Sequence, residues 1–307
     1  MNYIVVLNWN SENETINCVN SLLELKNFSD CRLIICDNNS SNSSYETIKS
    51  HLSSLKNNNF VELNEENIDN DNYNCNIVLI KNKENYGYAG GNNRGIQLAL
   101  NDNDMENVWI LNNDTVVQPD TLIEILNKKN TSDEYGIIGS RLVRLDDKHS
   151  VQGIGGLVHN YFFTTKEIGR QFNIEDEIDE DNFEKKIDYV IGASFFVTKD
   201  CLKKNGFLCE DYFLYYEEID YCNRAKENGY KIGIASKSIV FHEQGVSTKL
   251  SDVADQCQVL NRIKLVKKFN KKRLLLVKVF TFLVILNRFR RREFKRGLNY
   301  LIYTLKS

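Results

Sequence analysis

Two groups of carboxylates in this sequence have the residue types and spacing that could support chemistry. Asp114 follows the apolar run 108–111 and two amides, Asn112 and Asn113. A carboxylate is costly to bury unless it is paired or bound to a metal. Carboxylate and amide oxygens suit Mg²⁺ or Mn²⁺, ions that bridge phosphates. Asp114 therefore either holds a cation or caps a turn, since Asp and Asn are also common turn residues.

The second group is Glu217, Glu218 and Asp220, three carboxylates at the expected start of a helix. Acids favour a helix N-terminus because of the helix dipole, which would be a purely structural explanation. The neighbouring side chains between Phe213 and Tyr221 are mostly aromatic or aliphatic, so these acids do not lie on a solvated face. Like charges in apolar surroundings push one pKa upward, and a raised pKa suits a general base.

Three further segments end in polar residues that could bind a ligand or simply form turns. Asp37 follows the apolar run 32–36 and could accept hydrogen bonds from a ribose or base, or cap a turn. The segment 85–95 holds four glycines, which permit close backbone approach just before a phosphate-binding helix N-terminus. Its glycine spacing does not match the dinucleotide fingerprint. His242 follows another apolar run and is either a structural histidine or, beside Asp114, a metal ligand.

The elements that position these residues alternate between strand and helix. Four strand–helix repeats are typical of a doubly wound, mostly parallel sheet, in which ligands lie beyond the carboxyl ends of the strands. The polar clusters fall at these strand ends. Apolar runs and helical spacing predict strands at 3–9, 32–36, 77–81 and 108–111, and helices at 14–26, 44–55, 92–100 and after Pro119.

The rest of the chain is less regular. We interpret the Asn-rich, acidic segment 57–76 as a loop insertion. Segment 188–198 is apolar with one glycine, and 215–230 is an acidic-starting helix with Gly229 just past its end. Segment 231–245 predicts one or two strands. One domain with a carboxyl-terminal extension is the simplest organisation.

Composition places the chain among globular proteins. It has 307 residues, 42% of them apolar, and eight cysteines, none of them in a C-x-x-C pair. Zinc and dithiol sites are therefore not indicated. The start of the sequence lacks the features of a signal peptide, so we expect reduced thiols in the cytoplasm. The net charge of −3 hides an asymmetry, because 15 basic residues and one acid lie in residues 262–307.

Seven segments, taken in order, resemble glycosyltransferase family 2. They are VVLNWN, CDNNSS, NYGYAGGNNRG, ILNNDTVV, IGASFFV, YYEEIDYCNRAKENGY and VFHEQG, all within residues 1–245. Rhamnosyltransferase-like and galactofuranosyltransferase-like members are the most similar. The resemblance implies a GT-A catalytic domain at 1–250, a Rossmann-like, mostly parallel α/β sheet with flanking helices. Its donor half would be about 1–118 and its acceptor half about 119–250, and residues 251–307 would be a basic amphipathic helical extension.

The resemblance also implies a role for each matching residue. Asp114 would hold Mn²⁺ or Mg²⁺ with His242 as second ligand, and Glu218, beside Glu217, would be the general base. Asp220 and Arg224 would support that helix. The residues implied to bind the donor, a nucleoside-diphosphate sugar with UDP or dTDP as the expected nucleotide, are Asn8, Asp37, Asn85, Gly87, Asn93, Asn112 and Asn113.

This sequence departs from the family pattern at two of these positions. Asn112 replaces the first carboxylate of the D-x-D metal motif. That replacement weakens the case for metal binding or implies a different set of ligands. Glu218 is one methylene longer than the usual Asp, which changes its reach toward the acceptor.

The predicted function is inverting, metal-dependent sugar transfer to a hydroxyl of a glycan or lipid-linked oligosaccharide, as in bacterial O-antigen or capsule synthesis. A catalytically inactive GT-A-like binding module is one alternative, which Asn112 keeps open. The other is a nucleotidyltransferase acting on sugar phosphates. It would need a Gly-rich loop with a basic residue after the first strand, where this chain has NWNSENET.

The basic extension contains a 13-residue apolar run, Leu274 to Leu286, interrupted by Lys278. This run is shorter than the roughly 20 residues that span a membrane. The region predicts either one amphipathic helix or two helices in succession. On one continuous helix, a basic stripe would form from Lys264, Lys267, Lys271, Lys278, Arg292 and Lys295.

Basic residues above an apolar face are typical of a helix that lies in a membrane interface. We therefore expect residues 262–307 to attach the protein to the inner face of the cytoplasmic membrane. A packed helical hairpin or a homo-oligomer contact is the alternative. Nucleic acid is not an expected partner, because no nucleic-acid-binding motif accompanies the basic residues.

Overall fold

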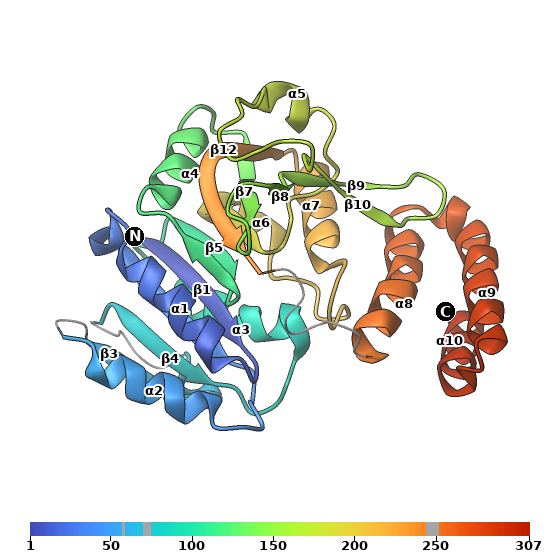
Figure 1. Ribbon diagram of the computed structural model, residues 1–307, viewed down its shortest axis with the longest axis horizontal. Helices are drawn as coiled ribbons and strands as arrows, with labels where there is room; N and C mark the ends of the chain where they lie inside the picture. Colours follow the sequence, from blue (N-terminus) through green and yellow to red (C-terminus); the bar gives the residue numbers. More distant parts are fainter. Residues whose placement is uncertain (57–58, 70–74, 244–251) are drawn as a thin grey trace.

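The computed structural model describes residues 1–56, 59–69, 75–243 and 252–307 (Figure 1). A mostly parallel sheet in strand order β3-β4-β2-β1-β5-β11-β7-β12-β6 forms its centre, with β8 paired to β7. The parallel half consists of β3 (Phe60–Asn64), β4 (Ile77–Lys81), β2 (Cys31–Asp37), β1 (Asn2–Asn8) and β5 (Asn107–Asn112). The predicted α/β class with a mostly parallel sheet is confirmed.

The second half of the sheet changes direction. Strand β11 (Ser194–Thr198) runs antiparallel between β5 and β7 (Tyr135–Arg144). Strand β12 (Lys231–His242) runs parallel to β7 and antiparallel to β6 (Thr115–Val117). Short strands β8 (Val151–Gly153), β9 (Gly155–Val158) and β10 (Thr165–Ile168) lie beside this half, and β9 and β10 form a separate ribbon.

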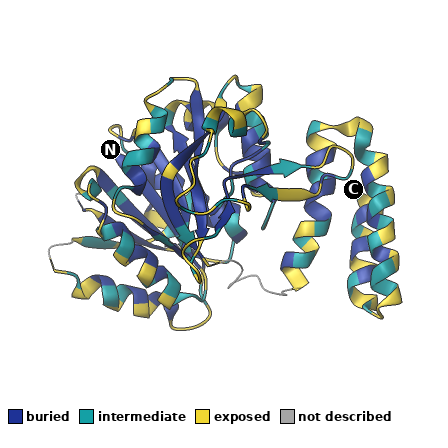
Figure 2. Cartoon of the chain, turned by 45° about the horizontal axis from the view of Figure 1, so that its top comes forward, coloured by how far each residue is buried: buried dark blue, intermediate teal, exposed yellow. Residues whose placement is uncertain are grey.

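Helices cover both faces of the sheet, giving three layers. One apolar core joins the sheet to α1 (Glu12–Leu23), α2 (Ser44–Ser54) and α4 (Thr121–Lys129). The other joins it to α3 (Gly87–Leu100), α6 (Lys199–Asn205) and α7 (Glu217–Glu227). Strands buried on both faces read as continuous apolar runs. The run Leu33 to Ile35 in β2 is fully buried for this reason, and the strands of the sheet are mostly dark blue in Figure 2.

Two predicted elements are wrong in their bounds. The segment 57–76 is not only a loop, because it contributes β3, which pairs in parallel with β4; residues 57–58 and 70–74 lie outside the described part. Helix α3 begins at Gly87 rather than residue 92. Its glycines belong to the helix and bring it close to β1: a Cβ on Gly91 would lie 2.5 Å from Leu7, and one on Gly95 would lie 2.6 Å from Val5.

The basic extension folds as three helices rather than one or two. They are α8 (Asp252–Phe269), α9 (Leu274–Arg290) and α10 (Phe294–Lys306), a group beside the sheet in Figure 1. The breaks between them mean that the six predicted basic residues do not form one stripe. Helix α8 is tied to the rest of the protein by Asn261, whose Nδ2 donates to the carbonyl oxygens of Leu214 and Tyr215, each at 2.9 Å. In the described residues, no helix is long and apolar enough to span a membrane.

Candidate active site

Asp114 lies in the turn between β5 and β6, at the carboxyl end of β5. The antiparallel register of β12 on β6 pairs His242 with Thr115, so the last residue of β12 lies beside this turn. Asp114 Oδ1 lies 3.3 Å from His242 Nε2. The same Oδ1 is buried and accepts no hydrogen bond from the part of the chain that the structure describes. The structure thus brings together the two residues predicted to hold a metal.

The imidazole of His242 is oriented by Gln152 in β8. His242 Nδ1 lies 2.9 Å from Gln152 Oε1, and both residues are buried. Because a carboxamide oxygen accepts, Nδ1 carries the proton and Nε2 presents a lone pair toward Asp114. This support by a second residue is common for metal-binding histidines. Gln152 was not predicted from the sequence, since a single Gln in a weak strand gives no signal.

The pair fits a divalent cation that also binds phosphate. A carboxylate oxygen and an imidazole nitrogen are suitable ligands for Mn²⁺. In the described residues, no group of three or more His, Cys, Asp or Glu side chains could hold a metal. Two protein ligands would leave the other positions for diphosphate oxygens and water, as is usual for such ions in nucleotide sites. Asn112, in place of the usual first acid, also has a buried Oδ1 to which no described residue donates.

Glu217 and Glu218 begin α7, directly after Tyr215 and Tyr216. Both tyrosines have positive φ, 67° and 79°, a backbone conformation that costs energy in residues other than glycine. The turn directs the two carboxylates into the protein: Glu217 is buried and Glu218 partly exposed. Each has one buried oxygen, Oε2, with no hydrogen-bond partner among the described residues.

The two glutamates have raised pKa values. Burial, followed by the nearby charge of Glu218, raises the pKa of Glu217 well above its usual value. Burial also raises the pKa of Glu218, to about 7. Glu218 is the more exposed of the two, so it is the better candidate for a base.

Glu217→Gln should stabilise the protein at neutral and alkaline pH. The folded-state pKa of Glu217 lies above the unfolded-state value, so the native state disfavours the ionised form. Wild-type stability is thus full below pH 4.5 and falls as pH rises through the folded-state pKa. Gln stays neutral, so the thermal midpoint of the variant should exceed that of wild type only above pH 4.5, by an amount that grows until the folded-state pKa is reached. An equal difference at pH 4 and pH 8 would contradict this assignment.

Two residues join the metal-binding pair to the glutamates. Tyr88, near the start of α3, is partly buried, and its pKa is raised well above normal by burial and by the charges of Glu217, Glu218 and Asp114. All three carboxylates are therefore close enough to Tyr88 for their charges to act on its phenol. Tyr88 Oη donates to the carbonyl oxygen of Gly192 at 2.7 Å. A Cβ on Gly192 would lie 3.9 Å from Glu218 Cβ. Both residues belong to segments that resemble the family, although neither was singled out.

A hydrogen-bond network links the ends of β1, β2 and β5. Asn8 Nδ2 donates to Asp37 Oδ1 at 2.6 Å, and Thr15 Oγ1 donates to Asn8 Oδ1 at 2.8 Å. Asp37 also accepts from the backbone N–H of Ser40. Asn113 Nδ2 donates to Thr15 Oγ1 at 2.9 Å. The predicted donor residues Asn8, Asp37 and Asn113 thus form one group at the strand ends.

Asn38 connects this group to α3. Its Nδ2 donates to Asn85 Oδ1 at 2.8 Å and to the carbonyl oxygen of Gly87 at 3.0 Å. Its Oδ1 accepts from Asn82 Nδ2 and from the backbone N–H of Tyr86. Asn38 was missed because it stands in the polar run after Asp37, where any residue could have made these contacts.

Gly87→Ala should destabilise the protein more than Gly229→Ala. Gly87 has a φ of +71°, and a Cβ there would lie 2.1 Å from the carbonyl oxygen of Phe213. Gly229 has a φ of +90°, and a Cβ there would have no described atom within 4 Å. We expect a loss of about 1 kcal/mol at Gly229, from the backbone alone, and at least about 2 kcal/mol at Gly87. Urea unfolding of both variants measures the difference; equal losses would contradict it.

Three predicted residues lie away from this group. Asn93 bonds the loop before α7: its Nδ2 donates to Glu210 Oε1 and its Oδ1 accepts from the backbone N–H of Leu208. Asp220 is fully buried between Arg224, at 2.8 Å, and Lys268 of α8, at 2.5 Å. Arg224 also donates to the carbonyl oxygens of residues 205 and 207. These residues therefore hold α7 and its preceding loop in place. Two residues of the VFHEQG segment, Gln244 and Gly245, lie outside the described residues.

The sequence model of glycosyl transferase family 2 matches residues 3–183, more than half of the chain. The chain belongs to this family. Over 173 residues it is 28% identical to the low-salt glycan biosynthesis hexosyltransferase Agl10 of Haloferax volcanii. The match covers 55% of this chain and 53% of Agl10, so the chain spans about half the length of that relative.

Solved structures show that this family member has the predicted GT-A fold. The mannosyltransferase PcManGT of Pyrobaculum calidifontis, in complex with GDP-Man and Mn²⁺, is similar with a TM-score of 0.58 at 11% identity. That similarity covers 100% of this chain and 75% of PcManGT. Residues 1–349 of S. aureus TarS, in complex with UDP-GlcNAc, give a TM-score of 0.54 at 12% identity, over 91% of this chain and 71% of that one. At these identities the likeness concerns the fold alone.

Proposed function

We propose that the protein is an inverting, metal-dependent glycosyltransferase that moves a sugar from a nucleoside-diphosphate sugar to an acceptor hydroxyl. One observation carries the proposal: Asp114, paired with His242, and the Glu217–Glu218 pair all lie near the phenol of Tyr88. A diphosphate site and a base are thereby held in one neighbourhood. Family membership and the nucleotide sugars in the similar structures support it.

Each residue then has a specific task. Glu218 removes the proton of the acceptor hydroxyl as that oxygen attacks the anomeric carbon from the face opposite the nucleotide. Glu217, neutral because of burial, leaves the single negative charge of the pair on Glu218. Asp114 and His242 would hold Mn²⁺ or Mg²⁺, which as a Lewis acid would stabilise the departing nucleoside diphosphate. Asn8, Asp37 and the amides around Asn38 form the nucleoside side of the site.

We propose that a surface glycan or a lipid-linked oligosaccharide is the acceptor, as in O-antigen or capsule synthesis. The support is the Agl10 relative, a hexosyltransferase of glycan biosynthesis. UDP and dTDP stay the expected donor nucleotides, although one similar structure contains GDP-Man. We also keep the proposed division at about residue 118 into donor and acceptor halves, since Asp37 and Asp114 precede it and Glu218 follows it.

Calorimetry with UDP, dTDP and GDP, each with Mn²⁺, Mg²⁺ or a chelator, tests the proposal. We expect one nucleotide to bind tightly and to lose most of its affinity in the chelator. A folded protein that binds none of them would overturn it. If binding is metal-dependent but no donor sugar is ever hydrolysed or transferred, the inactive binding module, favoured by Asn112, is the better assignment.

We further propose that α9 and α10 attach the enzyme to the inner face of the cytoplasmic membrane. Each helix leaves an apolar stripe with exposed fractions between 43% and 75%: Leu275, Val279, Leu283 and Leu286 on α9, and Phe294, Leu298, Ile302 and Leu305 on α10. Exposed basic residues lie at both ends of α9, at 271–272 and 290–292. Apolar residues flanked by Lys and Arg suit an interfacial helix.

Flotation with phosphatidylcholine–phosphatidylglycerol vesicles tests the attachment. Deleting residues 262–307 would remove core residues of α8 and so disturb the fold. Substitutions on the exposed stripe leave that core in place. Leu275→Gln combined with Leu283→Gln should release the protein from vesicles, whereas Val253→Gln, an equally exposed residue of α8, should not. Unchanged flotation of the double variant, or a stable dimer lost by the same change, would favour an oligomer contact instead.

A further inference from the structure

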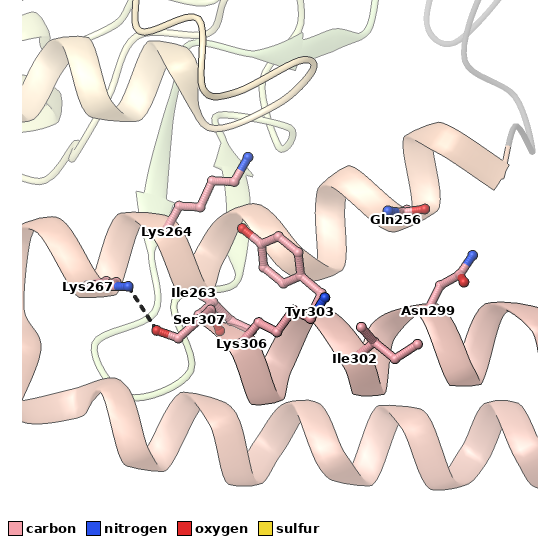
Figure 3. Close-up of a pocket in the computed structure, with 9 residues that line it drawn as sticks. All are labelled: Gln256, Ile263, Lys264, Lys267, Asn299, Ile302, Tyr303, Lys306 and Ser307. Atoms are coloured by element: carbon pink, nitrogen blue, oxygen red, sulfur yellow. Dashed lines mark hydrogen bonds between the residues drawn. The ribbon is translucent and has the colours of Figure 1, made fainter.

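A groove with a basic lining runs between α8 and α10 (Figure 3). Its volume is about 610 Å³. Lys264 and Lys267 reach it from α8 and Lys306 from α10, while Ile263, Ile302 and Tyr303 supply apolar surface. It is separate from the candidate active site, because none of the residues assigned to that site lines it.

The lysines of this groove differ from three neighbouring basic residues of the extension that have carboxylate partners. In the described part of the chain, Lys268, Arg288 and Arg296 are each paired with a carboxylate, whereas no ion pair is present at the three groove lysines. None of the lining side chains is acidic. Lys267 Nζ donates to the carbonyl oxygen of Ser307 at 2.9 Å. Three lysines therefore line the groove without a described carboxylate partner.

The surroundings of the groove indicate a ligand with both a charged and an apolar part. Ile302 lines the groove and also belongs to the exposed stripe of α10. An apolar chain could therefore continue from the groove onto the stripe without crossing a polar surface. Lysine ammonium groups bind phosphate as point charges. A phosphate monoester carries nearly two negative charges near pH 7, which suits a groove lined by three lysines.

We propose that this groove binds the phosphate head of an anionic membrane lipid, with Lys264, Lys267 and Lys306 around the phosphate and the acyl or prenyl chain along α10. The proposal rests on the proposed membrane attachment and adds selectivity for a terminal phosphate to it. One groove lysine also contacts the loop before α7. Lys264 Nζ donates to the carbonyl oxygen of Asp211 and lies 5.8 Å from the ring centre of Tyr212, in the loop that leads to α7.

The test compares two variants that remove the same charge. Lys267→Gln with Lys306→Gln removes two groove charges on exposed side chains, and leaves Lys264 and its loop contact intact. Lys271→Gln with Lys295→Gln removes two exposed charges of the same region outside the groove. Binding is measured with phosphatidylcholine vesicles that contain either phosphatidic acid, with a terminal phosphate, or phosphatidylglycerol. Calorimetry with soluble dihexanoyl phosphatidic acid measures the groove without a membrane.

We expect wild type to prefer phosphatidic acid, and the groove variant to lose about tenfold in affinity for it while binding phosphatidylglycerol as the control variant does. Equal losses of affinity in both variants for both lipids would show that binding depends only on the overall positive charge. That result would overturn the proposed phosphate site in the groove. Displacement of the vesicles by inorganic phosphate at equal concentration would overturn a lipid ligand. Binding of dihexanoyl phosphatidic acid without vesicle binding would overturn only the membrane attachment, and nucleotide affinity should stay unchanged throughout.

Discussion

Glu218→Gln is expected to lower kcat by about 10²–10⁴-fold, the usual contribution of a general base. The amide keeps the shape of the side chain but cannot accept a proton from the acceptor hydroxyl. Nucleotide affinity should stay within about twofold, because the carboxylate beside His242 is Asp114 and not Glu218. The measurement is steady-state transfer together with nucleotide calorimetry.

The matched control for this prediction is Glu227→Gln. Glu227 is the last residue of the same helix and is exposed, so it reports the effect of losing a carboxylate from α7 without losing the base. It should retain wild-type kcat. If Glu218→Gln also kept its activity while Glu217→Gln lost it, the base would be Glu217.

The pH dependence of the reaction follows from the same site. A base acts in its ionised form, so kcat/KM should rise with pH and level off above the pKa of Glu218, about 7. The charge of Glu167 on β10 is one cause that raises this pKa. Glu167→Gln should therefore move the rise to lower pH. An unmoved profile would show that Glu167 does not act on the base.

Much of the site could be predicted because parallel strands bring their carboxyl ends to one edge. Asp37 follows β2 and Asp114 follows β5, and the rule that ligands lie at such ends places both at the site. Asp114 and His242 also meet as expected from the resemblance. The contact that brings them together is the antiparallel pairing of β12 with β6. It could not be derived from the sequence, because the apolar pattern of a strand does not show in which direction the strand pairs with its neighbour.

The residues that connect the site could not be predicted, since their roles come from tertiary contacts. Tyr88 and Gly192 are far apart in the chain and meet only when the start of α3 packs against the segment before β11. The glycines of α3 were interpreted as a turn, because local propensity disfavours glycine in a helix. Their close packing on β1 overrides that propensity. The predicted basic stripe is wrong for a related reason. It requires one continuous helix, whereas the chain changes direction between Asn270 and Arg273.

Asp114→Asn should abolish metal-dependent nucleotide binding, with a loss of Mn²⁺ affinity of at least about 100-fold. The substitution keeps the size of the side chain but removes the carboxylate that the structure places beside His242 Nε2. Because Asn112 already stands in place of the first acid, the motif offers no second carboxylate to compensate. Residual nucleotide binding in the chelator should be the same in wild type and variant. Direct titration with Mn²⁺, followed by its paramagnetic resonance signal, measures the metal apart from turnover.

Graded variants distinguish loss of a ligand from loss of structure at this site. Gln152→Ala removes only the hydrogen bond that orients His242, and loss of such support costs about 10–100-fold in metal affinity. Asp120→Asn, on an exposed residue paired with Lys26, should have no effect. We therefore expect the loss of Mn²⁺ affinity to be largest for Asp114→Asn, smaller for Gln152→Ala and absent for Asp120→Asn. Full Mn²⁺ affinity in Asp114→Asn would remove Asp114 from the metal site and leave it as a turn residue, the structural role that Asp commonly takes at the end of a strand.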